Sequence, residues 1–361
     1  MAAMDAALSQ IIDRVRDSAA RQAPLCIRGG GTKDFHGPGA PRHAGEPLDM
    51  RPLAGIVSYE PSELVVTALA GTPLAELEAL LARHGQCLAF EPPRFAAGGT
   101  VGGMVAAGLS GPARASVGAV RDFVLGVEII NGRGELLRFG GQVMKNVAGY
   151  DVSRLLAGSL GTLGVLLEVS LKVLPLPVAE KSLRFAIDEA TALQKLNQWG
   201  GRPLPISASA WHDGILTLRL SGAAAAVAAA ERLLAGEWVD AAEAEVYWRS
   251  LREQTHAFFA GDAPLWRLSL PSVAPPQGFG ATLIEWGGAQ RWLRAGDARA
   301  LRSAAAKAGG HATLFRGDDA LKAAVGVFQP LPAPLAKIHR HLKLAFDPQE
   351  VFNPGRMYPD F

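Results

Sequence analysis

Glycine-rich loops are the residues in this sequence whose type and spacing most clearly indicate chemistry. The longest loop covers residues 98–112, another covers 158–165, and a third covers 28–33. Glycine has no side chain and tolerates positive φ, so such loops can bring their backbone N–H groups close to a ligand. Converging N–H groups of this kind bind phosphate. Each loop lies beside an apolar, strand-like run, and together the three predict one large dinucleotide site made of separate segments.

The elements that position these loops follow from the hydrophobic pattern. Residues 1–22 carry spaced apolar residues among charged ones, which is typical of an amphipathic helix. Thr72 is expected to cap a helix that begins at Pro73 and ends near His84. Residues 131–134 separate two apolar runs and predict a hairpin, because Asn and Gly tolerate the positive φ of a tight turn. Further strands are predicted at 24–27, 47–50, 56–59, 64–68 and 165–173, and a short helix at 150–156.

A second domain is predicted after Pro175 and Pro177, where the last strand of the first half ends and the glycine loops stop. Helical runs at 191–199 and 223–234 alternate there with strand-like runs, which predicts an antiparallel sheet with helices. All seven tryptophans lie in this half, either as core residues or as walls of a pocket or interface. The strand-like runs are 215–220, 265–270, 282–286 and 311–316.

Composition excludes several classes of protein. A chain of 361 residues, 49% of them hydrophobic, can bury a full core and is expected to form two domains. A net charge of +2 does not indicate nucleic-acid binding. Two cysteines, Cys26 and Cys87, exclude a disulfide framework and a four-cysteine iron–sulfur site within this chain, and we expect both to be buried free thiols. No secretory signal or membrane span is evident, so we expect a cytoplasmic protein, with docking at the inner membrane through a partner as the alternative.

The ordered set of motifs, rather than any one loop, resembles a known family. It occurs in the order found in the vanillyl-alcohol-oxidase, or PCMH, type of FAD-binding fold. Within that fold the chain resembles the FAD-binding subunits of glycolate oxidase, also called glycolate dehydrogenase. Rossmann and Walker loops fit less well, because no loop has their spacing and neighbours. The segments that carry the resemblance are 28–32, 90–93, 102–103, 109–112, 140–151, 158–164 and 346–355.

The resemblance implies an α+β fold in three parts. A two-lobed PCMH-type FAD-binding domain is expected over residues 1–177. A second α+β domain with an antiparallel sheet, on the substrate side, is expected over 178–335. Residues 336–361 would return to the FAD site, where two turn formers, Asp347-Pro348 and Asn353-Pro354, would hold the segment in a fixed shape.

The resemblance also implies which residues bind FAD. The loop 28–33 would form the first contact with the diphosphate, and Gly102, Gly103 and the residues up to Ser110 the second. Val165, just after Gly164, would meet the adenosine end through its backbone, and Asn353 would lie near the flavin. The expected cofactor residues are Arg28, Gly29, Gly30, Gly31, Thr32, Lys33, Pro92, Gly102, Gly103, Ser110, Gly164, Val165 and Asn353.

Non-covalent binding of the cofactor is expected. Some members of the resembled family attach flavin through a histidine in the first loop. Thr32 occupies that place in this chain, and a threonine cannot make the same bond. His36 follows four residues later and is expected to be an exposed loop residue.

The function implied by the resemblance is oxidation of glycolate, a 2-hydroxy acid, to glyoxylate. Such chemistry moves a hydride from the α-carbon to the flavin, while a base takes the hydroxyl proton and a cation holds the carboxylate. No residue of the sequence stands out as that base, so the catalytic residues are unassigned. The expected partners are a larger FAD-binding catalytic subunit and an iron–sulfur subunit that receives the electrons. The alternatives are a self-sufficient FAD-dependent dehydrogenase of another hydroxy acid or alcohol, and a scaffold subunit without catalysis.

A few other polar residues need a separate interpretation. Lys145 and Tyr150 lie in an apolar, glycine-rich segment, where packing or solvation is expected over contact with a ligand. His339 and His341 are two residues apart and would not share a helix face, so no metal site is expected. Arg316 lies on a predicted strand, where it could hold a carboxylate or serve the structure.

Overall fold

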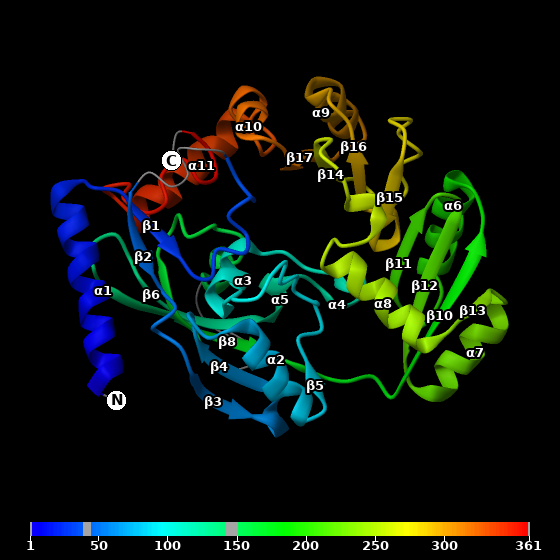
Figure 1. Ribbon diagram of the computed structural model, residues 1–361, viewed down its shortest axis with the longest axis horizontal. Coiled ribbons are helices and arrows are strands. Elements are labelled where there is room, and N and C mark those ends of the chain that lie inside the picture. Colours follow the sequence, from blue (N-terminus) through cyan, green and yellow to red (C-terminus); the bar gives the residue numbers. More distant parts are fainter. Residues whose placement is uncertain (1, 39–44, 142–150, 360–361) are drawn as a thin grey trace.

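The computed structural model describes residues 2–38, 45–141 and 151–359. The protein is α+β, with a five-stranded sheet in the half that carries the N-terminus and an eight-stranded sheet in the other half (Figure 1). After the second sheet the chain returns to the first half through α10 (Asp319–Val325) and α11 (Ala333–Phe346). The predicted fold class is therefore confirmed.

The N-terminal lobe consists of a long helix and a parallel pair of strands. The helix α1 (Ala2–Arg21) packs on an apolar cluster that includes β1 (Leu25–Arg28) and β2 (Glu46–Asp49). Phe352, which is fully buried, pairs with Leu25 as an isolated parallel bridge. The C-terminal segment thus completes this lobe from a distance of more than three hundred residues along the chain.

The five-stranded sheet is antiparallel throughout, in the order β3-β4-β8-β6-β7. Its apolar side is covered by α2 (Leu74–Arg83) and α3 (Val101–Ala107), whose buried residues form one core cluster with the strands. This packing holds the start of α3 beside the end of β4. The strands are β3 (Ile56–Glu60), β4 (Val65–Leu69), β6 (Val124–Ile130), β7 (Leu136–Gly140) and β8 (Val165–Lys172).

Two local predictions change in this half, and a third is confirmed. Thr72 does not cap α2: its buried hydroxyl exchanges hydrogen bonds with the backbone of Gly55, and Pro73 takes the cap position. The helix expected at 150–156 is a shorter 3-10 helix, Ser153–Leu156, in the part that is described. The predicted hairpin joins β6 and β7, with Gly134 at a φ of 70° in its turn.

The eight-stranded sheet is also antiparallel, in the order β13-β10-β12-β11-β15-β16-β14-β17. It contains the four predicted strands and four that the sequence did not reveal. The polar residues of β16 (Gln290–Arg294) obscure its pattern, although Gln290 and Arg291 are buried. The remaining strands are β10 (Ala179–Ala186), β11 (Ile206–His212), β12 (Ile215–Gly222), β13 (Glu237–Val239), β14 (Leu265–Ser269), β15 (Thr282–Glu285) and β17 (His311–Arg316).

Helices flank this second sheet. Both predicted helices are present, as α6 (Glu189–Gly200) and α7 (Ala224–Leu234), and α8 (Ala241–Arg252) and α9 (Ala298–Lys307) were not predicted. Most of the tryptophans are buried core residues, whereas Trp238 is 56% exposed.

Beside the predicted boundary, and still within the first half, β5 (Gln86–Cys87) pairs with β9 (Leu174–Pro175). Cys26 and Cys87 form no disulfide, as expected, but they are half-buried rather than buried. Among the described helices, none combines the length and the apolar character needed to cross a membrane. The division at residues 177 and 335 stays a prediction.

Candidate functional site

The loop after β1 presents backbone donors to a cavity. Residues 27–34 line this cavity together with Thr100 and Arg356. In the described part of the chain, no protein group accepts a hydrogen bond from the amides of residues 29–33. A ligand that offers acceptor oxygens can therefore use these amides, and Lys33 and Arg356 add positive charge beside them.

Glycine is required in this loop because the loop touches the backbone of a second one. A β-carbon on Gly30 would lie 1.6 Å from the carbonyl oxygen of Gly98. A β-carbon on Gly29 would lie 2.3 Å from the Thr100 hydroxyl oxygen. Both distances are far below van der Waals contact, so the absence of side chains is what allows the two loops to meet.

Helix α3 begins in the second loop, but its first amides serve the protein rather than a ligand. The Gly102 amide donates to the Ala70 carbonyl at 2.7 Å, and the Gly103 amide donates to Thr100 Oγ1 at 3.1 Å. A β-carbon on Gly102 would lie 2.7 Å from Ala70 Cβ. Gly102 therefore matters for close packing of α3 on β4, and the expected contact of Gly102 and Gly103 with the diphosphate stays a prediction.

Asn353 joins three segments at the end of the site. Its Oδ1 accepts from the Ile27 amide at 2.8 Å, and its Nδ2 donates to the Leu160 carbonyl at 2.8 Å. Gly161, at a φ of 72°, leaves the space that the Asn353 amide fills. The residue is 5% exposed, so its amide ties β1 to the third glycine loop.

Two cavities continue into each other between these loops. The one at the first loop is about 90 Å³, and the other, about 60 Å³, extends from it to Gly164 and Leu166. They share Ile27, Gly29 and Gly103 as walls. Val165 lines neither of these two cavities, and its side chain is buried in the core.

Lys33 marks the other end of the first cavity. Burial lowers the pKa of Lys33 to about 8, although Glu253 and Glu78 raise it. The Lys33 ammonium lies 5.7 Å from the centre of the Phe95 ring. Phe95 in turn lines a third, small cavity that reaches the second domain. The contact between Lys33 and Phe95 thus relates the cavity at the first glycine loop to the one at the second sheet.

The third cavity brings together polar residues that the sequence did not single out. Ser110 and Phe95 form its first-domain wall, and β14 to β17 form the opposite wall. Pro92 is buried nearby but does not line these three cavities. The second-domain residues on the wall include Gln254, Arg267, Glu285, Gln290, Trp292 and Phe315.

Glu285 and Arg267 are the ionisable residues that the second sheet contributes here. Glu285 is 3% exposed, and its Oε2 accepts from Trp292 Nε1 at 2.6 Å and from Gln290 Nε2 at 3.0 Å. Burial raises the pKa of Glu285 to about 7, against these hydrogen bonds. Burial also lowers the pKa of Arg267 to about 10, and the charge of Arg114 adds to this effect. Within the described residues, no carboxylate pairs with Arg267.

His36 is buried rather than exposed, which corrects the expectation from the sequence. It is 3% exposed and packs between Phe315 and Phe328, and its Nδ1 has no partner among the described residues. Burial holds its pKa well below the ordinary range, and the cations Arg267, Arg356, Lys322 and Lys33 lower it further. His36 is therefore neutral, and the rings of Phe315 and Phe328 pack against it.

Arg316 has aromatic rather than carboxylate neighbours. Its guanidinium lies 5.0 Å from the centre of the Phe35 ring and 5.7 Å from that of Phe95. This stacking favours the structural interpretation. Among the described residues, no group of three His, Cys, Asp or Glu side chains is placed to hold a metal ion. Lys145 and Tyr150 lie outside the described residues.

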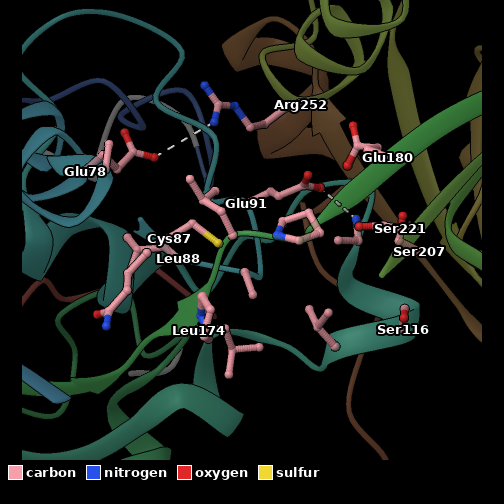
Figure 2. Close-up of a pocket in the computed structure, with 18 of the residues that line it drawn as sticks. Glu78, Cys87, Leu88, Glu91, Ser116, Leu174, Glu180, Ser207, Ser221 and Arg252 are labelled. Atoms are coloured by element: carbon pink, nitrogen blue, oxygen red, sulfur yellow. Dashed lines mark hydrogen bonds and ion pairs between the residues drawn. The ribbon is translucent and has the colours of Figure 1, made fainter. Parts of the chain in front are cut away.

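A cavity of about 760 Å³ lies between the two halves and away from the glycine loops (Figure 2). Glu78 faces Arg252 at 3.9 Å on one side of it, and Glu91 forms an ion pair with Arg219 at 2.7 Å on the other. Burial raises the pKa of the Cys87 thiol in its wall to about 11, so that thiol stays protonated and unreactive. Because its charges are already paired, this cleft resembles a joint between domains more than a ligand site.

The chain is similar in sequence to known FAD-binding proteins. A family model described as an FAD binding domain matches residues 6–140, which include the first two glycine loops. Glycolate oxidase subunit GlcE of Escherichia coli (strain K12) is 48% identical over 352 residues, which cover 97% of this chain and 97% of that protein. The chain belongs to the GlcE family of glycolate oxidase subunits. The resemblance seen in the motifs is thus confirmed, and with it the assignment to the FAD-linked oxidoreductases.

More distant relatives by sequence match less than half of this GlcE-family chain. Glycolate oxidase subunit GlcD of Bacillus subtilis (strain 168) is 32% identical over 163 residues, which is 45% of this chain and 34% of GlcD. A D-lactate dehydrogenase of Archaeoglobus fulgidus is 32% identical over 155 residues, 43% of this chain and 34% of that protein. The solved structure of an alkyldihydroxyacetonephosphate synthase shares the fold at a TM-score of 0.66 and 15% identity, covering 96% of this chain and 74% of the other.

One signal in the sequence could have revealed part of the second-domain wall. Arg267 is a charged residue between Trp266 and Leu268 in an otherwise apolar strand, which is unusual for a buried sheet. Glu285 and Gln254 carry no comparable local signal. Their significance depends on the cross-strand neighbours and on the burial that the fold creates.

Proposed function

We propose that this chain is the FAD-carrying subunit of a glycolate oxidase complex that oxidises glycolate to glyoxylate. The observation that carries the proposal is the row of amides at residues 29–33, which face a cavity and donate to no protein acceptor in the described chain. The phosphate oxygens of FAD are acceptors suited to such a row. When bound, FAD supplies the two-electron acceptor that oxidation of an alcohol carbon needs.

We propose that the parts of FAD lie along these cavities in order. The adenosine end would lie beside Gly164, and the Val165 backbone would meet it there. The diphosphate would lie on the amides of residues 29–33, and the flavin would extend past Lys33 towards Phe95 and Ser110. Gly102 and Gly103 support the site by allowing close packing.

We propose that FAD is held without a covalent bond. Among the described residues that line the two cavities at the glycine loops, none is a histidine, cysteine or tyrosine. Thr32 lies in the first of these cavities, and its hydroxyl is a poor nucleophile without a neighbouring base. His36 is enclosed by aromatic rings instead.

The electrons must then leave through other subunits. Two cysteines cannot hold an iron–sulfur cluster of the four-cysteine type, so we propose an iron–sulfur subunit as the acceptor. We also propose a larger FAD-binding subunit of the GlcD type in the same complex, and a cytoplasmic location that places the assembly at the inner membrane through its partners.

The test begins with the absorbance spectrum of the purified chain after incubation with FAD or FMN. We expect a bound flavin spectrum with FAD, and release of all the flavin into the supernatant after acid precipitation. Flavin that stays with the precipitate would contradict non-covalent binding. Absence of any bound flavin would contradict the proposed function. Co-expression with a larger flavin subunit and an iron–sulfur subunit should give a complex that reduces a dye when glycolate is added.

A further inference from the structure

The segment 91–95 of the first half is held by a carboxylate of the second. Glu253, the residue that follows α8, accepts through Oε2 from the amides of Arg94 and Phe95, each at 2.9 Å. Its Oε1 accepts from Arg252 Nε at 2.8 Å, so both carboxylate oxygens have partners. The prolines at 92 and 93 have no amide hydrogen, and the two bound amides are therefore the first donors after them along the chain.

The backbone of this segment is strained where Glu253 holds it. Phe95 has a φ of 61° and Glu91 a φ of 50°, in the left-handed region that residues with side chains rarely adopt. Such a conformation persists only when its surroundings fix it. The carboxylate of Glu253 is one such fixing group, because it accepts from the amide of the strained Phe95.

The held segment lies close to the cofactor site. The centre of the Phe95 ring is 5.2 Å from that of Phe35 and 5.7 Å from the Lys33 ammonium. Gly98, which follows shortly along the chain, provides the carbonyl that leaves no room for a β-carbon on Gly30. A shift of the backbone at residues 94–95 would therefore disturb both the aromatic wall beside Lys33 and the contact between the first two glycine loops.

We propose that Glu253 is a positioning residue of the cofactor site, through which the second domain holds residues 94–95, and with them the Phe95 ring, against Lys33. The inference rests on the proposed function, because the site that Glu253 positions is the one where FAD is expected. It gives the second domain a part in cofactor binding that the glycine loops of the first do not supply. FAD would then bind well only while the two halves stay joined.

A network of alternating charges surrounds this joint. Glu78 of α2 accepts from Arg94 Nε at 2.5 Å and faces Arg252 at 3.9 Å, on the wall of the cleft between the two halves (Figure 2). The side chains of Glu78 and Glu253 are only 16% and 18% exposed, so salt screens them little. Substitution of Glu253 leaves the ion pair of Glu78 and Arg94 in place. Such a substitution therefore tests the contacts to the two amides separately from that ion pair.

Glu253 also acts on Lys33 through its charge. Burial lowers the pKa of Lys33 to about 8, while Glu253 and Glu78 raise it. Glu253→Gln removes one negative charge, so Lys33 should lose its proton at lower pH. Because the ammonium would attract the FAD diphosphate, FAD affinity should then begin to fall at lower pH. The other charged side chains around Lys33 stay the same in this variant, together with the neutral His36: Arg28, Asp34, Arg316 and Arg356.

Amide hydrogen exchange and FAD titration of the full chain test the inference. Glu253→Ala removes the acceptor, so the amides of residues 94–95 should exchange faster, and FAD affinity should fall by about tenfold to a hundredfold. Glu253→Gln keeps an acceptor oxygen, so exchange and FAD affinity at pH 6 should stay within a few-fold, while the pH profile of FAD binding shifts to lower pH. Glu245→Gln, which changes an exposed carboxylate of α8, is the matched control and should alter neither measurement.

The outcomes separate this inference from the proposed function. Equal exchange at residues 94–95 in Glu253→Ala and the natural protein would overturn the hold on the segment. Faster exchange with unchanged FAD affinity and an unchanged pH profile would show that Glu253 only stabilises the fold, and would overturn its part in the cofactor site. A natural chain that bound no FAD would overturn the proposed function. In that case, faster exchange at residues 98–103 in Glu253→Ala would still support the hold on the glycine loops, and unchanged exchange there would overturn it.

Discussion

A β-carbon on Gly30 would lie 1.6 Å from the carbonyl oxygen of Gly98, so the first two glycine loops touch through their backbones alone. Gly30→Ala should force them apart and disturb the amides of residues 29–33. We expect a loss of about 1–3 kcal/mol in the free energy of unfolding and a fall of at least about tenfold in FAD affinity. Thermal unfolding and a titration of FAD fluorescence measure the two effects.

Gly200→Ala is the matched control for this prediction. Gly200 ends α6, and a β-carbon there would meet no atom within 4 Å. The control should leave FAD affinity unchanged. Equal FAD affinity for Gly30→Ala and the natural protein would show that the packing of these loops does not shape the cofactor site.

The amide of Asn353 predicts a graded effect on stability. Asn353→Ala removes both side-chain hydrogen bonds, to the Ile27 amide and the Leu160 carbonyl, and leaves one part-buried and one buried backbone group unsatisfied. We expect a loss of about 2–4 kcal/mol in the free energy of unfolding. Asn353→Asp keeps the acceptor for the Ile27 amide. Its side chain can donate to the Leu160 carbonyl only when it is protonated, so its loss of stability should be intermediate at low pH. Denaturant unfolding would show the order, and equal stability of Ala and Asp would contradict the account.

Lys33 predicts a pH dependence of FAD binding. Burial lowers its pKa to about 8, so the ammonium loses its proton as pH rises through this value in the free protein. Because the charged form attracts the diphosphate, FAD affinity should fall between pH 7 and pH 9. Lys33→Arg should remove this fall, since arginine stays charged, and Lys33→Met should bind weakly at every pH. Lys307→Met on α9 is an exposed control, and an unchanged pH profile in Lys33→Arg would contradict the prediction.

Glu285 predicts a pH dependence of stability. Burial raises its pKa from 4.5 to about 7, so the folded state keeps a proton that the unfolded state releases. Its contribution to stability therefore falls as pH rises from about 4.5 to 7, by at most about 1.4 kcal/mol per pH unit, and then levels off. Glu285→Gln stays neutral, so it should gain stability relative to the natural protein between pH 5 and pH 8. The Glu245 side chain is 74% exposed in the natural protein, so Glu245→Gln should show no such gain. If the free energy of unfolding of Glu285→Gln followed the same pH dependence as that of the natural protein, the raised pKa of Glu285 would be contradicted.

The first half of the fold was predictable because its signals are local. The hairpin at 131–134, the helix of residues 1–22 and the strand at 165–173 all have clear periodicity or turn residues, and each is present. The second sheet was predicted only in part. In β16, Gln290 and Arg291 are buried by contacts from other strands, and the local pattern gives no sign of this.

The sequence by itself determined which segments lack side chains and which family carries these loops. Freedom at positive φ and the absence of a β-carbon are properties of each glycine, wherever the chain places it. Only the tertiary structure decided which amides stay available: those of residues 29–33 have no protein acceptor in the described chain, whereas those of Gly102 and Gly103 do. It also buried His36 and brought Arg267 and Glu285 to one cavity, because burial and pairing depend on contacts between segments far apart in the chain.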